Sequence, residues 1–237
     1  AGSSSDQYGP GCLNSQGKAV ISGGTFEGAS KRTYAIISTG NMVICEEDGA
    51  VAVTGVHGAV SSDGGTLDIY GGTFTSTEFY GLYVSNDGAG ADPKKAAVNI
   101  YGGEFTGPSY SVWLGSDVND PVDSVINIWG GVFHKDIMLQ ENAETSGAIR
   151  IYGGTYGKAL KESLLASGYH QVKNGDQTYT VQAQSPSASV GDRTFASLED
   201  AFRAARDGET ITMLKSVEET DGVMLDDGRE LTVDLNG

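Results

Sequence analysis

The sequence predicts an all-β fold, a parallel β-helix (solenoid) followed by a small α+β segment. Three observations predict it: a six-residue motif occurs five times, apolar and polar residues alternate around it, and no helical pattern interrupts the copies. The copies begin at Ile21, Ile69, Ile100, Ile128 and Ile151, in steps of 48, 31, 28 and 23 residues. Because the first step is about two of the last, we expect a degenerate copy around Val43–Glu47.

Each copy is expected to form a strand, a tight turn and a second strand. Val98 and Ile100 are separated by the polar Asn99, which is the alternation of a half-buried strand. The paired glycines that follow allow a sharp turn, where a Cβ would clash or φ must be positive. A further apolar run, such as Leu82–Val84 or Val112–Leu114, predicts another strand. Strands stacked about 4.8 Å apart then share one continuous core.

Stacking aligns equivalent residues into rows. The isoleucines that begin the motif form an inward aliphatic row. The residues that end it form an inward aromatic row of Phe26, Phe74, Phe105, Phe133 and Tyr156. The residue after each isoleucine points outward, and four of these are aromatic: Tyr70, Tyr101, Trp129 and Tyr152. We call these four residues the aromatic stripe.

The end of the solenoid is expected to carry a cap. Three leucines at helical spacing within Ala159–Ala166, followed by Gly168, predict a short capping helix that protects the last turn from edge pairing. Residues 1–183 are therefore expected to form the solenoid with its cap, and the polar stretch 184–190 a linker.

Beyond the linker, residues 191–237 predict a helix and two strands. Ser197 is placed to cap the helix, and Thr210–Leu214 and Leu231–Leu235 read as strands. This piece looks like the truncated start of a second β-helix module.

Composition and charge exclude several classes of protein. Fifteen Lys and Arg against 31 Asp and Glu give a net charge of −16, which repels phosphate. Nucleic acids and anionic membrane surfaces are therefore not expected partners. A hydrophobic content of 38% is too high for a disordered acidic tail. No stretch approaches the roughly 20 apolar residues of a membrane span, so no membrane insertion is expected.

The repeats resemble those of a known family. The segment Ile69–Phe74 and its equivalents are similar to repeats in pectate-lyase-like right-handed β-helix regions of large bacterial surface proteins. Gly168–Val181 resembles the stretch that closes such regions, and Phe195–Leu214 and Thr232–Gly237 resemble the opening of the next one. The resemblance implies a right-handed solenoid, an extracellular location (secreted or attached to the cell surface) and flanking domains in the same longer polypeptide. It says little about chemistry, because the fold carries lyases, hydrolases, adhesins and inert stalks.

The aromatic stripe suits a glycan. Sugar rings pack their C–H faces on aromatic planes while polar neighbours hydrogen-bond the hydroxyls. The expected glycan-binding residues are Tyr70, Tyr101, Trp129, Tyr152, Asn99, Asn127 and Arg150. Tyr83, Tyr110 and Trp113 on the neighbouring segment are expected to widen this surface. The alternative is a structural ladder, in which the rings stack on each other and shield the strands.

Two insertions between the repeats predict an acidic ridge. Both follow the second apolar run of a turn, so stacking gathers on one edge Asp87, Asp92, Asp117, Asp120 and Asp123. Carboxylates and carbonyls suit Ca²⁺, which is the one cofactor that the sequence suggests. The alternative is a pair of solvated turns rich in Asn, Asp, Gly and Pro.

Signals for redox or catalytic chemistry are weak. Cys12 and Cys45 form a disulfide worth about 3–4 kcal/mol outside the cell, or Cys45 stays a buried thiol because it aligns with the isoleucine row. His57, within Val56–Gly58, is at best a remnant of the Gly-His-Gly that hydrolases of this fold carry. No partnered carboxylate is visible, and no catalytic residue is assigned.

The expected function follows from these observations. We expect a non-catalytic segment of a large extracellular bacterial surface protein, which binds carbohydrate or a host surface glycoprotein or acts as a rigid spacer. The alternative is an enzyme: a polysaccharide lyase, a glycoside hydrolase, or an accessory part of one.

Overall fold

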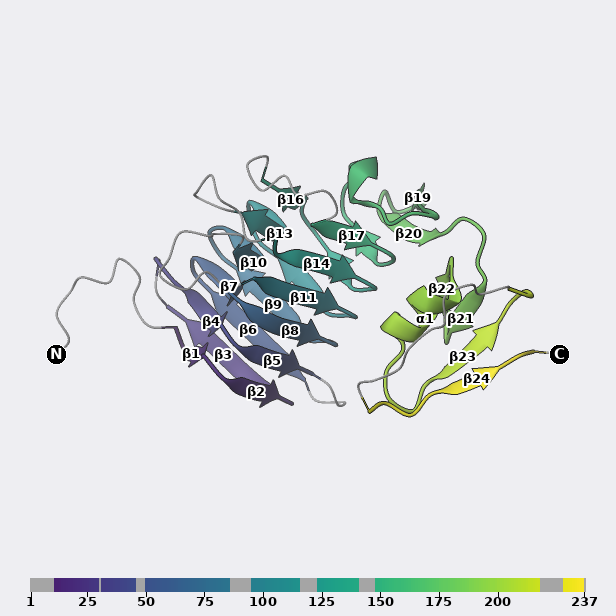
Figure 1. Cartoon of the computed structure of the whole chain (residues 1–237). Coiled ribbons are helices and arrows are strands. Elements are labelled where there is room, and N and C mark those ends of the chain that lie inside the picture. Colours follow the sequence, from purple (N-terminus) through teal and green to yellow (C-terminus); the bar gives the residue numbers. More distant parts are fainter. Residues whose placement is uncertain are drawn as a thin grey trace.

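The chain winds into a parallel β-solenoid, as the repeats predict (Figure 1). The computed structural model describes residues 11–29, 31–45, 50–85, 95–115, 123–140, 148–217 and 228–236. The turns stack from β1 (Leu13–Ser15) at one end to β18 (Thr155–Tyr156) at the other. The all-β parallel β-helix is therefore confirmed.

Three parallel sheets make up the walls of the solenoid. The first sheet contains β1, β4 (Tyr34–Ser38), β7 (Gly58–Ser62), β10 (Tyr80–Ser85), β13 (Tyr110–Gly115) and β16 (Ile137–Leu139). The second contains β2 (Lys18–Ile21), β5 (Asn41–Ile44), β8 (Gly65–Ile69), β11 (Ala96–Ile100), β14 (Val125–Ile128) and β17 (Ile149–Ile151). The third contains β3 (Gly24–Gly28), β6 (Val51–Gly55), β9 (Thr73–Ser76), β12 (Glu104–Thr106), β15 (Val132–Phe133) and β18.

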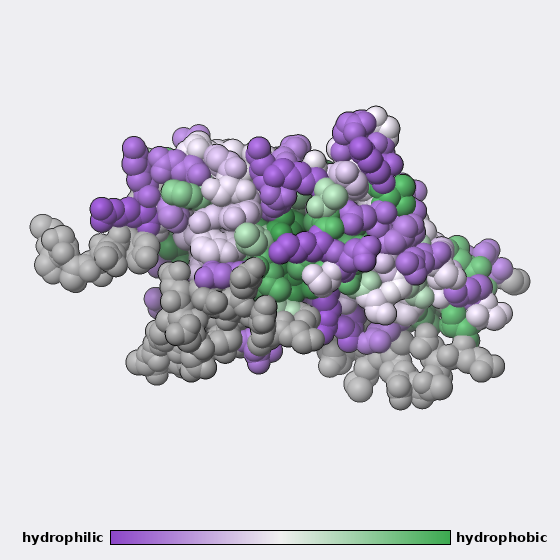
Figure 2. Space-filling view, turned by 90° about the horizontal axis from the view of Figure 1, so that it is seen from above, coloured by the Kyte–Doolittle hydropathy of each residue, from purple (hydrophilic) through white to green (hydrophobic). Residues whose placement is uncertain are grey.

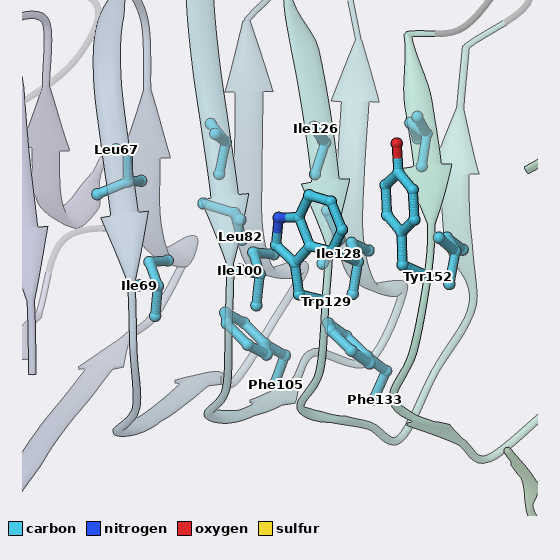
Figure 3. Close-up of a cluster of buried hydrophobic side chains, with 14 of the residues drawn as sticks. Leu67, Ile69, Leu82, Ile100, Phe105, Ile126, Ile128, Trp129, Phe133 and Tyr152 are labelled. Atoms are coloured by element: carbon cyan, nitrogen blue, oxygen red, sulfur yellow. The ribbon is translucent and has the colours of Figure 1, made fainter. Parts of the chain in front are cut away.

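The predicted rows form the core. The isoleucines that begin the motif are all buried, and Ile44 pairs with both Ile21 and Ile69, which confirms the degenerate copy. In the third sheet, the aromatic rings that follow one another from Phe74 to Tyr156 stack with centroids 4.8, 5.1 and 5.0 Å apart, and Figure 3 shows Phe105 and Phe133 in this row. Phe26 is only half-buried, because its strand β3 is the edge strand of the third sheet and pairs with β6 alone among the described strands.

The two glycines of each motif are needed for different reasons. A Cβ on Gly130 would lie 2.6 Å from the carbonyl oxygen of Tyr101 in the preceding turn. Gly131 has φ +109°, a conformation that side chains with a Cβ rarely adopt. The first glycine thus allows the turns to stack closely, and the second redirects the chain into the third sheet.

The predicted capping helix is wrong. The leucine-rich stretch contains only a 3₁₀ turn at Glu162–Leu164, because Leu164 turns into the core and Leu165 continues the second sheet by bridging to Ile151. The last turn is closed instead by the hairpin of β19 (Tyr169–Lys173) and β20 (Tyr179–Ala183). Strand β20 pairs antiparallel with β18 and so covers the edge of the third sheet.

The C-terminal segment, described over residues 187–217 and 228–236, forms a second small unit beside the solenoid (Figure 1). It contains β21 (Ala188–Val190), β22 (Arg193–Phe195), helix α1 (Leu198–Ala204), β23 (Thr210–Met213) and β24 (Thr232–Asp234). The predicted helix and two strands are present, and the Ser197 hydroxyl accepts a hydrogen bond from the backbone N–H of Asp200 at 3.0 Å. Residues 188–190, expected in the linker, instead pair with β22 and β23.

Most of the described surface is polar. Figure 2 shows hydrophilic side chains over much of one side, with an apolar patch near its middle and smaller apolar patches toward the right end. Helix α1 has seven residues, and no helix in the described ranges is long and apolar enough to cross a bilayer. The outer faces of the sheets carry aromatic and polar side chains, and these are the candidate functional residues.

Candidate functional site

The structure aligns the aromatic stripe along the ends of the second-sheet strands, but as two stacked pairs. The Tyr70 and Tyr101 rings are 4.6 Å apart and inclined by 7°, and the Trp129 and Tyr152 rings are 3.9 Å apart and inclined by 15°. Figure 3 shows the second pair face to face on adjacent turns. Tyr70 and Tyr101 are half-buried, whereas only 3% of Trp129 and 7% of Tyr152 are exposed.

The C-terminal segment and the cap cover much of the aromatic stripe. Phe195 approaches Trp129 with ring centroids 6.5 Å apart, and Tyr169 of the cap meets the edge of Tyr152 at 5.3 Å. The Arg206 guanidinium lies 5.0 Å from the Tyr70 ring centroid and donates a hydrogen bond to the Tyr70 carbonyl at 2.9 Å. The stripe is therefore the surface on which the chain docks its own C-terminal segment.

The cap and the C-terminal segment also share a buried polar contact. The Tyr169 hydroxyl donates to the Asp200 carboxylate at 3.0 Å and accepts from the backbone N–H of Ala196 at 3.1 Å. Burial raises the pKa of both the Asp200 carboxyl and the Tyr169 hydroxyl. This contact fixes α1 against the end of the solenoid.

The polar residues expected to assist the aromatic stripe hydrogen-bond to each other. The Asn99 amide donates to Asp68 at 2.8 Å, and the Asn127 amide donates to Asn99 at 3.0 Å, one turn further on. Arg150 follows in the same register and is exposed. The structure brings all the predicted glycan-binding residues into one region. Its ring faces and amides, however, are largely engaged within the protein, which favours the structural-ladder interpretation.

A cavity of about 440 Å³ lies between the aromatic stripe and the C-terminal segment. It is lined by four charged residues, Asp68, Arg206, Asp207 and Arg229, together with Asn99 and the two half-buried tyrosines of the stripe, Tyr70 and Tyr101. Arg229 donates to the carbonyls of Phe202 and Ala205 at the end of α1, and Asp207 accepts from the backbone N–H of Glu230. These bonds lie within the C-terminal segment, whereas Arg206 bonds across the cavity to the carbonyl of Tyr70.

The predicted calcium ridge falls mostly outside the described residues. Asp87, Asp92, Asp117 and Asp120 lie there, and the ridge stays a prediction. Asp123 is described, is exposed and has φ 58°. Within the described ranges, no three His, Cys, Asp or Glu side chains gather closely enough to hold a metal ion.

Cys12 and Cys45 do not form a disulfide in the structure. Cys45 is buried, as one alternative predicted, but its expected alignment with the isoleucine row is wrong. Ile44 occupies that row, and the N–H of Cys45 donates to the carbonyl of Ile21, which places Cys45 in register with Tyr70. Cys12 is exposed.

The outer face of the first sheet carries a different and more open feature, a groove of about 550 Å³ that we call the axial groove. Its lining comes from successive turns and so runs along the solenoid axis. Strand β7 forms the floor, with the small residues Gly58 and Ser61 buried between larger side chains of β4 and β10. A Cβ on Gly58 would lie 2.3 Å from the ring of Tyr34, so that ring lies directly over the floor.

Aromatic rings form one wall of the axial groove. Tyr34 and Tyr83 stack across β7 with centroids 5.6 Å apart and an inclination of 15°. Trp113 is inclined by 56° to Tyr83 and by 46° to Tyr80, at 5.1 and 4.7 Å. All four rings are half-buried. Because Trp113 is tilted against Tyr80 and Tyr83, the four rings do not form one continuous stacked column, and all four line the groove.

Polar side chains form the opposite wall. Gln16, Thr39, Asp63 and Ser85 each stand at the ends of neighbouring first-sheet strands and line the groove. The Ser61 hydroxyl donates to the Asp63 carboxylate at 2.5 Å, and burial raises the pKa of this carboxyl. No lysine or arginine is among the described residues that line the groove.

Two buried polar atoms in the groove have no hydrogen-bond partner in the described structure. They are Oγ1 of Thr33, a residue only 2% exposed, and Nδ1 of His57. Burial lowers the pKa of His57, which keeps the ring neutral at pH 7, and Tyr34 and Phe79 pack against it at 5.1 and 4.8 Å. Unsatisfied buried polar groups are costly and mark places where a ligand can supply the missing hydrogen bond.

Sequence reasoning identified part of this groove. Tyr83 and Trp113 were expected beside the aromatic stripe, but they lie on a different sheet and face a different direction. Tyr34 and Asp63 were missed as site residues, and His57 was considered only as a remnant of a catalytic motif. The available signal was the small size of Gly58, which lies between Tyr34 and Tyr80 of the neighbouring turns, and of Ser61, which lies between Ile37 and Tyr83.

Comparison with models of protein families, with curated proteins and with solved structures found no match. The function is therefore argued from the geometry of this chain alone.

Proposed function

We propose that this chain is a carbohydrate-binding segment of an extracellular bacterial surface protein, and that the axial groove holds the glycan. The observation that carries the proposal is one open groove with tilted aromatic rings on one wall and hydrogen-bonding side chains on the other. The resemblance of the repeats to pectate-lyase-like regions of surface proteins supports the extracellular setting.

The chemistry of the groove fits sugars. A pyranose has apolar C–H faces that pack on Tyr83 and Trp113, and a rim of hydroxyls that both donate and accept hydrogen bonds. The opposite wall supplies a carboxylate, an amide and hydroxyls. A volume of about 550 Å³ lies within the usual range of small-ligand sites.

A spacer role is the second candidate, and a separate observation favours it. The C-terminal segment packs against the aromatic stripe through Phe195 and Arg206, so it is connected to the solenoid by contacts as well as by the chain itself. A solenoid joined firmly to the next unit holds its exposed groove in a fixed direction. The spacer role and the binding role are therefore compatible.

A glycan array tests the binding proposal. The wild-type chain is compared with Trp113→Ala and with Tyr101→Ala, a matched aromatic variant on the other face. We expect Trp113→Ala to weaken binding about 30-fold or more, as for the loss of an aromatic hot spot, and Tyr101→Ala to leave it within about twofold. A chain that binds no glycan, or a loss confined to Tyr101→Ala, contradicts the proposal.

A further inference from the structure

The described lining of the axial groove contains an acidic side chain and no basic one. Asp63 is the one acidic side chain among its described lining residues, and no described lysine or arginine lines the groove or forms an ion pair with Asp63. The whole chain carries a net charge of −16. A uronate, sulfate or sialate placed beside Asp63 would meet an unscreened negative charge at short range.

The position of Asp63 suits an anchor for hydroxyl groups. An ionised carboxylate only accepts hydrogen bonds, and bonds to a charged acceptor are about twice as strong as neutral ones. Ser61 donates to one carboxylate oxygen, Oδ1, at 2.5 Å and fixes the orientation of the group. The second oxygen, Oδ2, is then oriented to accept from a ligand, and adjacent sugar hydroxyls are donors of the right kind.

The groove also has a direction. Its lining residues come from five successive strands of the first sheet, β1, β4, β7, β10 and β13. At a spacing of about 4.8 Å these five strands extend over roughly 19 Å along the axis. An extended glycan chain advances by about one strand spacing per sugar, so consecutive sugars meet consecutive turns.

From these observations, and resting on the proposed function, we propose that the axial groove takes an uncharged linear glycan. The chain lies along the solenoid axis, with Asp63 accepting hydrogen bonds from its hydroxyls and Tyr83 and Trp113 packing on its sugar faces. Thr33 Oγ1 and His57 Nδ1 lie just before the first residues of β4 and β7, so they supply further hydrogen-bonding atoms at the other end of these strands from Asp63.

The test measures affinity by calorimetry for two sets of soluble polysaccharides. The neutral set contains a β-glucan, a mannan and a xylan, and the acidic set contains polygalacturonate and heparin. Each set is titrated into the wild-type chain, Trp113→Ala, Asp63→Asn and Ser61→Ala. Asp63→Asn keeps the size of the side chain, and Ser61→Ala leaves the carboxylate in place but removes its orienting bond.

We expect a member of the neutral set to bind and the acidic set not to bind. Asp63→Asn is expected to weaken neutral binding about tenfold or more, and Ser61→Ala to weaken it by a smaller factor. Binding of an acidic polysaccharide that Trp113→Ala abolishes overturns the inference and keeps the proposed function. Neutral binding that both Asp63→Asn and Ser61→Ala leave within twofold also overturns it. No binding of either set refutes the proposed function itself.

Discussion

Replacing Trp129 by alanine separates a docking role of the aromatic stripe from a ligand-binding role. The Trp129 side chain is 3% exposed, stacks on Tyr152 at 3.9 Å and approaches Phe195 of the C-terminal segment. Truncation of a buried tryptophan costs about 3–5 kcal/mol, of which the ring stacking accounts for about 0.5–1.5 kcal/mol. Part of this loss is expected to fall on the joint, because Trp129 contacts both units.

The assay is hydrogen exchange followed peptide by peptide, with urea unfolding monitored by the remaining tryptophan, Trp113. We expect Trp129→Ala to reduce protection in α1 and β22 more than in the first-sheet strands. Tyr101→Ala, a half-buried ring of the same stripe, is the control and is expected to cost on the order of 1 kcal/mol with little change in α1. Unchanged protection of α1 in Trp129→Ala would refute the docking role.

Four further predictions follow from other contacts. Gly131→Ala, at φ +109°, is expected to lower the free energy of unfolding by about 1–3 kcal/mol. Gly175→Ala, with no atom within 4 Å of the added Cβ, is the control and is expected to change it by no more than about 0.5 kcal/mol. Urea unfolding measures both. Gly58→Ala is expected to displace the Tyr34 ring and weaken glycan binding, because the added Cβ would lie 2.3 Å from that ring. The melting temperature is expected to fall as well, because the Cβ would also lie 3.2 Å from the backbone carbonyl oxygen of Tyr80; unchanged affinity contradicts the assignment of the groove. The pKa of Asp63 is raised in the folded state, so its charge lowers stability above that pKa. Asp63→Asn is therefore expected to raise the melting temperature at pH 7, and the gain to shrink as the pH falls through the raised pKa; a gain that is constant with pH contradicts it. Tyr169→Phe is expected to cost about 1–3 kcal/mol by removing the hydrogen-bond partner of the partly buried Asp200 and of the Ala196 N–H, and denaturation at pH 7 measures this loss.

The sequence predicted the solenoid well because its rows repeat. Ile69 and Phe74 recur with the same neighbours in each turn, and stacking turns one-dimensional spacing into three-dimensional register. The prediction of a capping helix was wrong because leucines at helical spacing also fit an extended chain in which one leucine enters the core and the next adds to a sheet. Leu164 and Leu165 do the latter, and only the presence of Ile151 in the previous turn decides it.

The candidate site was harder to predict than the fold. Outward orientation of Trp129 follows from register, but its burial depends on residues 66 positions later that fold back on it, such as Phe195. The axial groove likewise depends on Gly58, because the lack of a side chain at this position leaves room for the Tyr34 ring to lie over the strand. A single small residue such as Gly58 forms no recognisable sequence motif. The groove can therefore be identified only from the structure, in which neighbouring turns lie side by side.

The two tryptophans of the chain allow the most direct test of where a ligand binds. Trp113 lines the axial groove and Trp129 lies in the joint, so Trp129→Phe and Trp113→Phe each leave one fluorescent reporter. Titration of both variants with a neutral glycan that the chain binds is expected to shift and quench the emission of Trp113 and to leave that of Trp129 unchanged. A response of Trp129 with none from Trp113 would contradict the assignment of the groove and return the site to the aromatic stripe.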